Sequence, residues 1–168
     1  QAGRLAFADS LPFLDGDVDL VMIAVGTPPA RSGEADLTSI FAVAEEIAAM
    51  AHERVIVVIK STVPAGTGDA VERLIAAVRP DLDLCVASNP EFLREGSALA
   101  DFMRPDRVVI GTQDLRARNA LMRLYRPLTD AGVPLLATTR TAAEITKYAA
   151  NAFLALKITF INEIADLC

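Results

Sequence analysis

Five short apolar runs along this chain have the length and composition of buried β-strands. They lie at residues 20–25, 55–59, 84–87, 107–110 and 133–136. The segments between them carry apolar residues at helical spacing, at 38–51, from Gly68 to about 78, and at 115–128. Strands that alternate with helices are typical of a parallel sheet covered on both faces, so the pattern predicts an α/β fold of the doubly wound type.

The longest predicted element is a helix at the carboxyl end of the chain. Thr141 and Glu144 have the spacing of a capping box, in which the threonine caps the helix and the glutamate reaches back to it. From there to Cys168 apolar residues occur on almost every side, among them Phe153 and Leu156. A helix of this kind is buried on most sides, so we expect it to lie between domains or in a subunit interface.

Composition narrows the class of protein. The chain has 168 residues, of which 52% are hydrophobic, enough for one domain with a sizeable core or for one domain with a piece of a second. Its net charge of -6 leaves no basic surface for nucleic acid. The apolar runs fall short of the roughly 18 residues of a membrane span. Cys85 and Cys168 are too far apart in sequence to indicate a metal site or a disulfide framework, which favours the reducing cytoplasm.

Candidate ligand-binding residues follow three of the predicted strands. In doubly wound sheets ligands bind beyond the carboxyl ends of the strands. The segments 26–29, 61–64 and 88–91 occupy these positions and are rich in proline and small polar residues. They are expected to let a ligand approach the backbone, and the alternative is ordinary turn chemistry.

A glycine fingerprint for a dinucleotide is absent. The nearest match begins at Gly66 and Gly68, but Val71 occupies the third glycine position. We interpret this stretch as a turn and the start of a helix.

Two pairs of polar residues four positions apart are the strongest candidates for chemistry. Glu91 and Glu95 flank Arg94 and would share a helical face as base and electrostatic partner, or form a solvated salt-bridge cluster. Lys147 and Asn151 lie on the apolar final helix, where burial is costly unless a ligand pairs with them. One interpretation is that the two side chains stabilise an oxyanion. The alternative is that Lys147 extends its ammonium group to solvent while Asn151 caps a neighbouring loop.

The chain resembles the nucleotide-sugar 6-dehydrogenases, the family of UDP-glucose and GDP-mannose dehydrogenases. The motifs that carry the resemblance run in the family's order over the whole chain, at 23–28, 61–64, 89–96, 105–111 and 143–163. Members of this family oxidise the C6 alcohol of the sugar to a carboxylate in two hydride transfers to NAD, through a cysteine-linked thioester. The stretch 146–155 is most similar to the UDP-glucose branch.

The resemblance implies catalytic roles for five residues. Glu91 is similar to the general base associated with thioester hydrolysis, and Lys147 with Asn151 to the oxyanion-stabilising pair. Thr62 and Glu95 resemble residues that position water and touch the cofactor.

The same resemblance implies the binding residues. The NAD site would be lined by Val25, Gly26, Thr27, Pro28, Ser61, Thr62 and Glu95. The nucleotide sugar would be held by Glu91, Phe92, Leu93, Arg94, Lys147 and Asn151. No metal is implied.

The resemblance also implies a division of the chain. Residues 1–140 would be the latter part of the NAD-binding domain, without its first βαβ unit, and residues 141–168 the start of a central helix that pairs two subunits. The glycine fingerprint would precede Gln1 and the nucleophilic cysteine would follow Cys168, so this chain alone is expected to be inactive.

Two other readings compete with this one. A β-hydroxyacid dehydrogenase would share the Ser-Thr turn and the Lys/Asn pair, but segment 90–95 argues against it. A non-catalytic scaffold with the same fold is the second, and the presence of Glu91, Glu95, Lys147 and Asn151 together argues against that.

Overall fold

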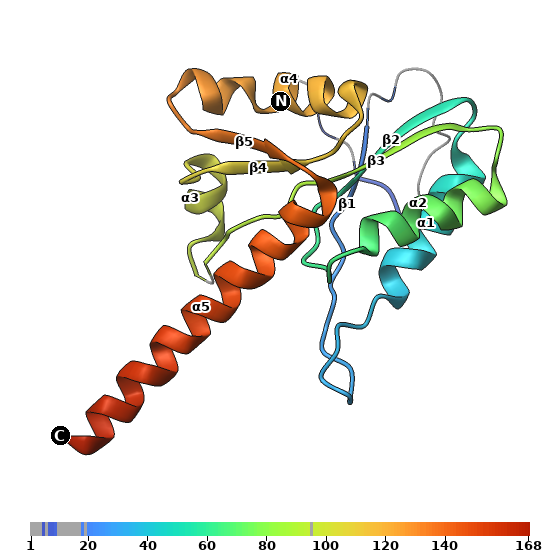
Figure 1. The fold of residues 1–168 in the computed structure, drawn as a ribbon. Coiled ribbons are helices and arrows are strands. Elements are labelled where there is room, and N and C mark those ends of the chain that lie inside the picture. The colour runs from blue at the N-terminus through green and yellow to red at the C-terminus, as the bar shows by residue number, and fades with distance from the viewer. Residues whose placement is uncertain (1–4, 6, 10–17, 19, 95) are drawn as a thin grey trace.

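A computed structural model describes residues 5, 7–9, 18, 20–94 and 96–168, and Figure 1 shows its fold. The sheet contains β1 Val21–Ile23, β2 Arg54–Ile59, β3 Asp83–Ser88, β4 Val108–Gly111 and β5 Leu135–Thr138. The helices are α1 Thr38–Met50, α2 Thr67–Val78, α3 Ala98–Met103, α4 Leu115–Asp130 and α5 Arg140–Leu167. The predicted alternation of strands and helices is therefore confirmed, with α3 as an element that the apolar pattern did not predict.

The sheet has the order β1-β2-β3-β4-β5 and is mostly parallel. The prediction of a parallel sheet is wrong at one pair, because β3 and β4 run antiparallel through Ser88 and Gly111. A parallel pair requires a crossover that returns the chain to the amino end of the sheet. The connection from β3 to β4 contains only the short helix α3, which buries none of its residues, so the chain re-enters the sheet at the edge where it left.

The two faces of the sheet pack against different helices. In β2, Val57 and Ile59 join the cluster formed with α1 and α2, whereas Val58 joins the cluster that contains Leu121 of α4. Successive side chains of a strand point to opposite faces, so β2 contributes to both cores. The doubly wound architecture is thereby confirmed, and the carboxyl ends of β1, β2 and β3 lie at one edge of the sheet, where α5 packs against Ser88 at the end of β3.

Helix α5 begins earlier than the sequence predicts. Thr139, not Thr141, is its N-cap, and the Thr139 hydroxyl oxygen accepts a hydrogen bond from the Ala142 N–H at 3.2 Å. Strand β5 ends at Thr138, so the extended residue that follows it is already in place to cap the helix. The predicted capping box is therefore wrong, and Glu144 has another set of partners, described below.

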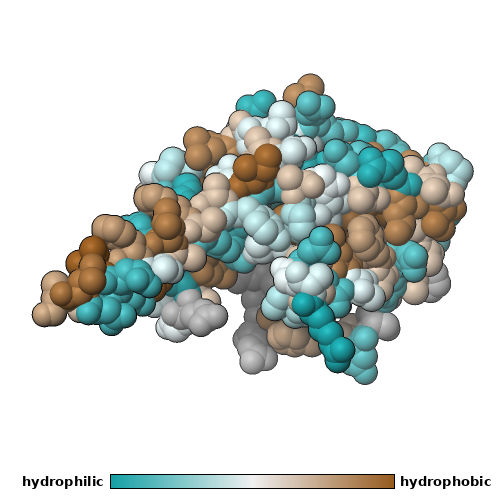
Figure 2. All heavy atoms as spheres, turned by 60° about the horizontal axis from the view of Figure 1, so that its bottom comes forward, coloured by the Kyte–Doolittle hydropathy of each residue, from teal (hydrophilic) through white to brown (hydrophobic). Residues whose placement is uncertain are grey.

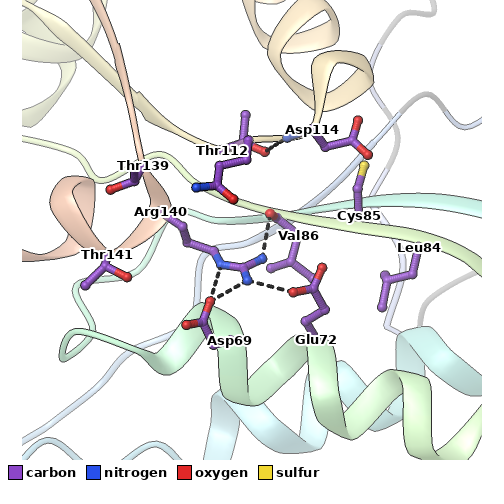
Figure 3. A pocket seen from close by; sticks show the side chains of 11 residues that line it. Asp69, Glu72, Leu84, Cys85, Val86, Thr112, Asp114, Thr139, Arg140 and Thr141 are labelled. Atoms are coloured by element: carbon purple, nitrogen blue, oxygen red, sulfur yellow. Dashed lines mark hydrogen bonds and ion pairs between the residues drawn. The ribbon is translucent and has the colours of Figure 1, made fainter.

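An ion-pair cluster holds the first turn of α5 against α2 (Figure 3). The Arg140 guanidinium donates to Glu72 at 2.6 Å and to the Val86 carbonyl oxygen at 2.9 Å, and it also pairs with Asp69. These residues line a cavity of about 260 Å³. Because Arg140 already pairs with Asp69, Glu72 and the Val86 carbonyl oxygen, we interpret this cavity as part of the packing of α5 rather than as a ligand site.

The distal part of α5 projects away from the sheet (Figure 1). Its large side chains are exposed, with Phe153 at 63%, Leu156 at 64% and Phe160 at 63% of their accessible area. The burial predicted for this helix is therefore not supplied by the described part of the chain. None of the helices in that part combines the length and apolar character that crossing a membrane requires.

Gly111 is expected to be essential for the docking of α5. A Cβ atom at this position would lie 2.5 Å from the Ala143 Cβ and 2.8 Å from the Thr139 carbonyl oxygen. Overpacking of this kind costs about 1–3 kcal/mol, so Gly111→Ala should lower the free energy of unfolding by at least that amount. Gly26→Ala is the matched control, because its Cβ would meet nothing within 4 Å. Equal urea midpoints for the two variants would contradict this account of the packing.

Candidate active site

The three predicted ligand-facing segments meet at the carboxyl edge of the sheet. The Ser61 hydroxyl donates to the Val25 carbonyl oxygen at 2.7 Å. The Thr27 hydroxyl donates to the Thr62 carbonyl oxygen at 2.8 Å. These two bonds join the end of β1 to the end of β2, because parallel neighbouring strands deliver their following residues to the same edge. Gly26 and Pro28 remain exposed beside them.

Glu91 lies next to this edge, in the segment that follows β3. Its Oε1 atom lies 3.4 Å from the Thr62 hydroxyl and 3.9 Å from Lys147 Nζ. Its Oε2 atom is buried and has no hydrogen-bond partner among the described residues. A buried carboxylate oxygen without a partner is rare and costly. The carboxylate is therefore held through Oε1, and no described residue uses the hydrogen-bonding capacity of Oε2.

Lys147 approaches Glu91 from the first half of α5. Its side chain is only 7% exposed, so the ion pair with Glu91 compensates part of the cost of burying the ammonium group. The Lys147 ammonium also lies 5.3 Å from the centre of the Phe92 ring. The Arg107 guanidinium lies 4.2 Å from the centre of the same ring. Phe92 thus contacts two cations, which favours a fixed ring orientation.

A second lysine, Lys60, also lies near Glu91. Lys60 Nζ donates to the Asn89 carbonyl oxygen at 3.2 Å. Burial lowers the pKa of Lys60, and the charge of Lys147 lowers it further while that of Glu91 opposes both. Lys60 and Glu91 border a small cavity of about 30 Å³. Glu91 therefore faces one cationic group from the residue that follows β2, Lys60, and one from α5, Lys147.

A larger cavity lies beside this cluster. Its volume is about 760 Å³, within the range typical of small-molecule sites. Five of the predicted substrate residues line it, namely Phe92, Leu93, Arg94, Lys147 and Asn151. The remaining charged side chains of its wall are Asp101, Arg104, Asp106, Arg107 and Lys157. The wall thus carries five cationic groups against two carboxylates, which favours an anionic ligand.

The structure separates Arg94 from Glu91. Residues 91–94 form no helix, so the predicted helical face is wrong for this segment. Pro90 precedes it, and the Arg94 guanidinium pairs with Asp101 at 2.7 Å instead. Glu95 lies outside the described residues, and its pairing with Glu91 stays a prediction.

Asn151 lies one helical turn after Lys147 and is exposed on the cavity wall. Its side chain makes no hydrogen bond to a residue in the described ranges. Lys147 and Asn151 line the same cavity. Their role as an oxyanion-stabilising pair stays a prediction.

Sequence reasoning missed the residues that hold the Glu91 segment in place. Asn89 is 1% exposed, and its Nδ2 atom donates to the Val109 carbonyl oxygen at 2.8 Å. Its Oδ1 atom accepts a hydrogen bond from the Tyr125 hydroxyl. Burial raises the pKa of Tyr125 to about 12, so this hydroxyl keeps its proton. Asn89 lies two positions before Glu91 in the predicted ligand-facing segment 88–91, and this position was the one sequence signal that pointed to it.

Comparisons with known proteins decide the family. Residues 1–129 match the model for the NAD-binding domain of the UDP-glucose/GDP-mannose dehydrogenase family. Residues 141–168 match the model for the central domain of the same family. The chain belongs to the UDP-glucose/GDP-mannose dehydrogenase family. NAD is accordingly the cofactor of this domain.

Relatives in this dehydrogenase family are similar over almost the whole chain. A UDP-glucose 6-dehydrogenase of Rhizobium meliloti is 56% identical over 99% of the chain and 39% of its own length. One from Pseudomonas aeruginosa is 50% identical over 100% of the chain and 38% of its own length. The chain thus spans about two fifths of the length of these relatives.

Solved structures of this dehydrogenase family have the same fold. A UDP-glucose dehydrogenase from Pyrobaculum islandicum matches with a TM-score of 0.78 and 49% identity, over 85% of this chain and 33% of that one. A GDP-mannose dehydrogenase from Pseudomonas aeruginosa matches with a TM-score of 0.81 and 38% identity, over 88% of this chain and 35% of that one.

Proposed function

We propose that the complete protein is a UDP-glucose 6-dehydrogenase, which oxidises the C6 alcohol of UDP-glucose to the carboxylate of UDP-glucuronate. The substrate loses two hydrides in succession, one to each of two NAD molecules, and it passes through an aldehyde and a cysteine thioester on the way to the carboxylate. The single observation that carries the proposal is the Glu91–Lys147 pair beside a cavity of about 760 Å³ with a cationic wall. A base, an oxyanion-stabilising cation and an anion-binding wall are the parts that this chemistry requires.

The residues at the carboxyl edge fit NAD. Gly26 and Pro28 are exposed, and an added Cβ at Gly26 would meet nothing within 4 Å, so a flat ring can approach the backbone there. Val25 to Pro28 with Ser61 and Thr62 would hold the nicotinamide side, and Glu95 completes the set that we assign to the cofactor. When bound, NAD is the hydride acceptor.

The proposal also includes the division of the chain into a cofactor-binding domain at residues 1–140 and a central helix from residue 141.

Lys147 and Asn151 are assigned to the oxyanion that forms on the substrate. The ammonium of Lys147 can stabilise negative charge on the oxygen at C6, first as the alcohol loses its proton and later as water adds to the thioester. Glu91 takes the proton of that water, the carbon–sulfur bond breaks, and the cysteine leaves as thiolate. Thr62 donates to Glu91 and thereby helps to orient the carboxylate toward the water.

UDP-glucose is favoured over other nucleotide sugars. The two curated relatives described above, at 56% and 50% identity, are UDP-glucose 6-dehydrogenases, whereas the GDP-mannose dehydrogenase structure is 38% identical. The cationic wall would hold the diphosphate, and the backbone at Phe92 and Leu93 the sugar. The second candidate substrates are GDP-mannose and UDP-N-acetylmannosamine.

The proposed substrate is tested by assaying the complete protein with NAD and each of the three nucleotide sugars. We expect the highest kcat/KM with UDP-glucose. A higher value with GDP-mannose or UDP-N-acetylmannosamine would move the proposal to that substrate. Binding of nucleotide sugar without NADH formation would favour a non-catalytic scaffold.

Neither cysteine of the chain is expected to be the nucleophile. Burial raises the pKa of Cys85 to about 11, so it remains a thiol, which is a poor nucleophile. Cys168 follows Asn151 by 17 positions (168 minus 151), which is about 25 Å along a helix. Cys168→Ser in the complete protein should therefore keep near-normal activity, measured as NADH formation. Loss of activity with an unchanged circular dichroism spectrum would overturn this assignment.

The exposed part of α5 is proposed to pair with its copy in a second subunit. Figure 2 shows apolar side chains gathered along this projecting helix. Exposed apolar surfaces of this extent usually mark an interface.

Both cysteines are free, which agrees with a reducing cytoplasm as the location of the protein.

The complete protein should have the mass of a dimer in light scattering at micromolar concentration. Exchange of Phe160 for aspartate should shift the protein toward the monomer, because a charge in an apolar interface is costly. Asp166→Asn on the same helix is the control. A strictly monomeric complete protein would contradict the proposed pairing.

A further inference from the structure

Glu144 is a buried carboxylate with an unusual number of hydrogen bonds. It is 2% exposed. Its Oε2 atom accepts the Gly66 N–H at 2.7 Å, and its Oε1 atom accepts the Gly68 N–H at 2.9 Å. The Ser88 hydroxyl donates to Oε1 at 3.2 Å. Charge-assisted bonds to backbone N–H groups at a helix start are among the stronger polar contacts in proteins, so this carboxylate is firmly fixed.

The partners of Glu144 belong to the two segments that carry the other members of the site. Ser88 is the last residue of β3, three positions before Glu91. Gly66 is the N-cap of α2, four positions after Thr62. Glu144 itself lies in α5, three positions before Lys147, so the two side chains share one face of the helix. One carboxylate therefore joins α5 to both segments that face Lys147.

The position of Lys147 relative to Glu91 depends on how α5 lies on these segments. Lys147 Nζ and Glu91 Oε1 are 3.9 Å apart, close to the limit of an ion pair, so a small shift of the helix would break the contact. Arg140 secures the first turn of α5, and Glu144 secures the turn that precedes Lys147. The packing there is tight, because a Cβ at Gly68 would lie 3.0 Å from Glu144 Oε1.

We propose that Glu144 is a positioning residue of the reaction, which acts through Lys147 by fixing α5 against Ser88 and the start of α2. The inference rests on the proposed function, in which Lys147 stabilises the substrate oxyanion. Misplacement of a catalytic group by about 1 Å can cost about a hundredfold in rate, so the loss of this anchor should be visible in kcat.

The test is a double-mutant cycle in the complete enzyme, with the variants Glu144→Gln, Lys147→Ala and the two combined. Glutamine keeps the shape but loses the charge, and it presents an N–H₂ group to one of the backbone donors. We expect Glu144→Gln alone to lower kcat by about tenfold or more, with KM for NAD unchanged. In the Lys147→Ala background the same exchange should change kcat by less than about twofold, because the group that it positions is gone.

Thr139→Ala is the matched control, since it removes the cap of the same helix without touching Glu144. It should lower the melting temperature but leave kcat near that of the parent enzyme. Where Glu144→Gln does not fold, Ser88→Ala takes its place in the cycle, with a smaller loss of kcat that again vanishes without Lys147.

Three results would overturn the inference, and they differ. An unchanged kcat for a folded Glu144→Gln variant would show that Lys147 does not need this anchor, and it would leave the proposed function standing. An equal loss of kcat for Glu144→Gln in both backgrounds would show a purely structural role for Glu144 and leave the proposed function standing. An unchanged kcat for Lys147→Ala alone would remove the proposed function together with the inference.

Discussion

Replacement of Lys147 by alanine in the complete enzyme is expected to lower kcat by about 10²–10³-fold. The magnitude follows from the loss of one oxyanion-stabilising donor, which is worth about 2.7–4 kcal/mol in a site that excludes water. Lys147 has the required setting, because its side chain is 7% exposed and its ammonium lies beside Glu91 and the Phe92 ring. The same factor should appear in kcat/KM, since the interaction is made to charge that develops in the transition state.

Thr146→Ala is the control for Lys147→Ala. Thr146 neighbours Lys147 on α5 and is exposed, and its hydroxyl donates only to the Ala142 carbonyl oxygen within its own helix. Steady-state NADH formation for both variants, with circular dichroism as a check of folding, separates a chemical role from a structural one. A kcat near the parent value for a folded Lys147→Ala protein would exclude Lys147 from the chemistry.

The exchange Glu91→Gln is expected to stop the enzyme after the second hydride transfer. Glutamine has the size of glutamate but cannot take a proton from water, and general-base catalysis of this kind contributes about 10²–10⁴-fold. Turnover should fall by such a factor, and the sugar nucleotide should accumulate as a covalent adduct on the enzyme. Mass spectrometry of the intact protein after mixing with UDP-glucose and NAD measures the adduct directly.

Glu53→Gln serves as the control, because Glu53 is exposed at the amino end of β2, away from the carboxyl edge. It should show parental turnover and no added mass. If Glu91→Gln turned over normally, or stalled without an adduct, the base would have to be another group, with Glu95 the next candidate.

The sequence pattern predicts most of the fold because burial controls it. The strand at 55–59 and the helices at 38–51 and 115–128 differ from β2, α1 and α4 by only one or two residues at their ends. Helix α3 was not predicted, since its six residues bury nothing and leave no periodic signal. The antiparallel β4 was missed for a related reason. A strand's direction depends on the path of its connection, which an apolar run does not encode.

The candidate site was predictable where chain topology alone brings residues together. The segments after β1, β2 and β3 meet because parallel strands share an edge, and Ser61 and Thr62 bond to Val25 and Thr27 there. The partners of Glu144 and Asn89 could not be predicted. Each of these hydrogen bonds joins residues at least 20 positions apart in the sequence and depends on where the helices lie. Sequence spacing suggested a local capping role for Glu144, whereas the fold gives it a long-range one.

The number of NADH molecules formed for each UDP-glucose consumed by the complete enzyme tests the central claim most directly. The account predicts two, because an alcohol that becomes a carboxylate loses two hydrides at the site formed by Lys147 and Glu91. The measurement requires limiting UDP-glucose, excess NAD and quantitation of UDP-glucuronate. One NADH for each UDP-glucose, with release of the aldehyde, or no NADH at all, would contradict the account.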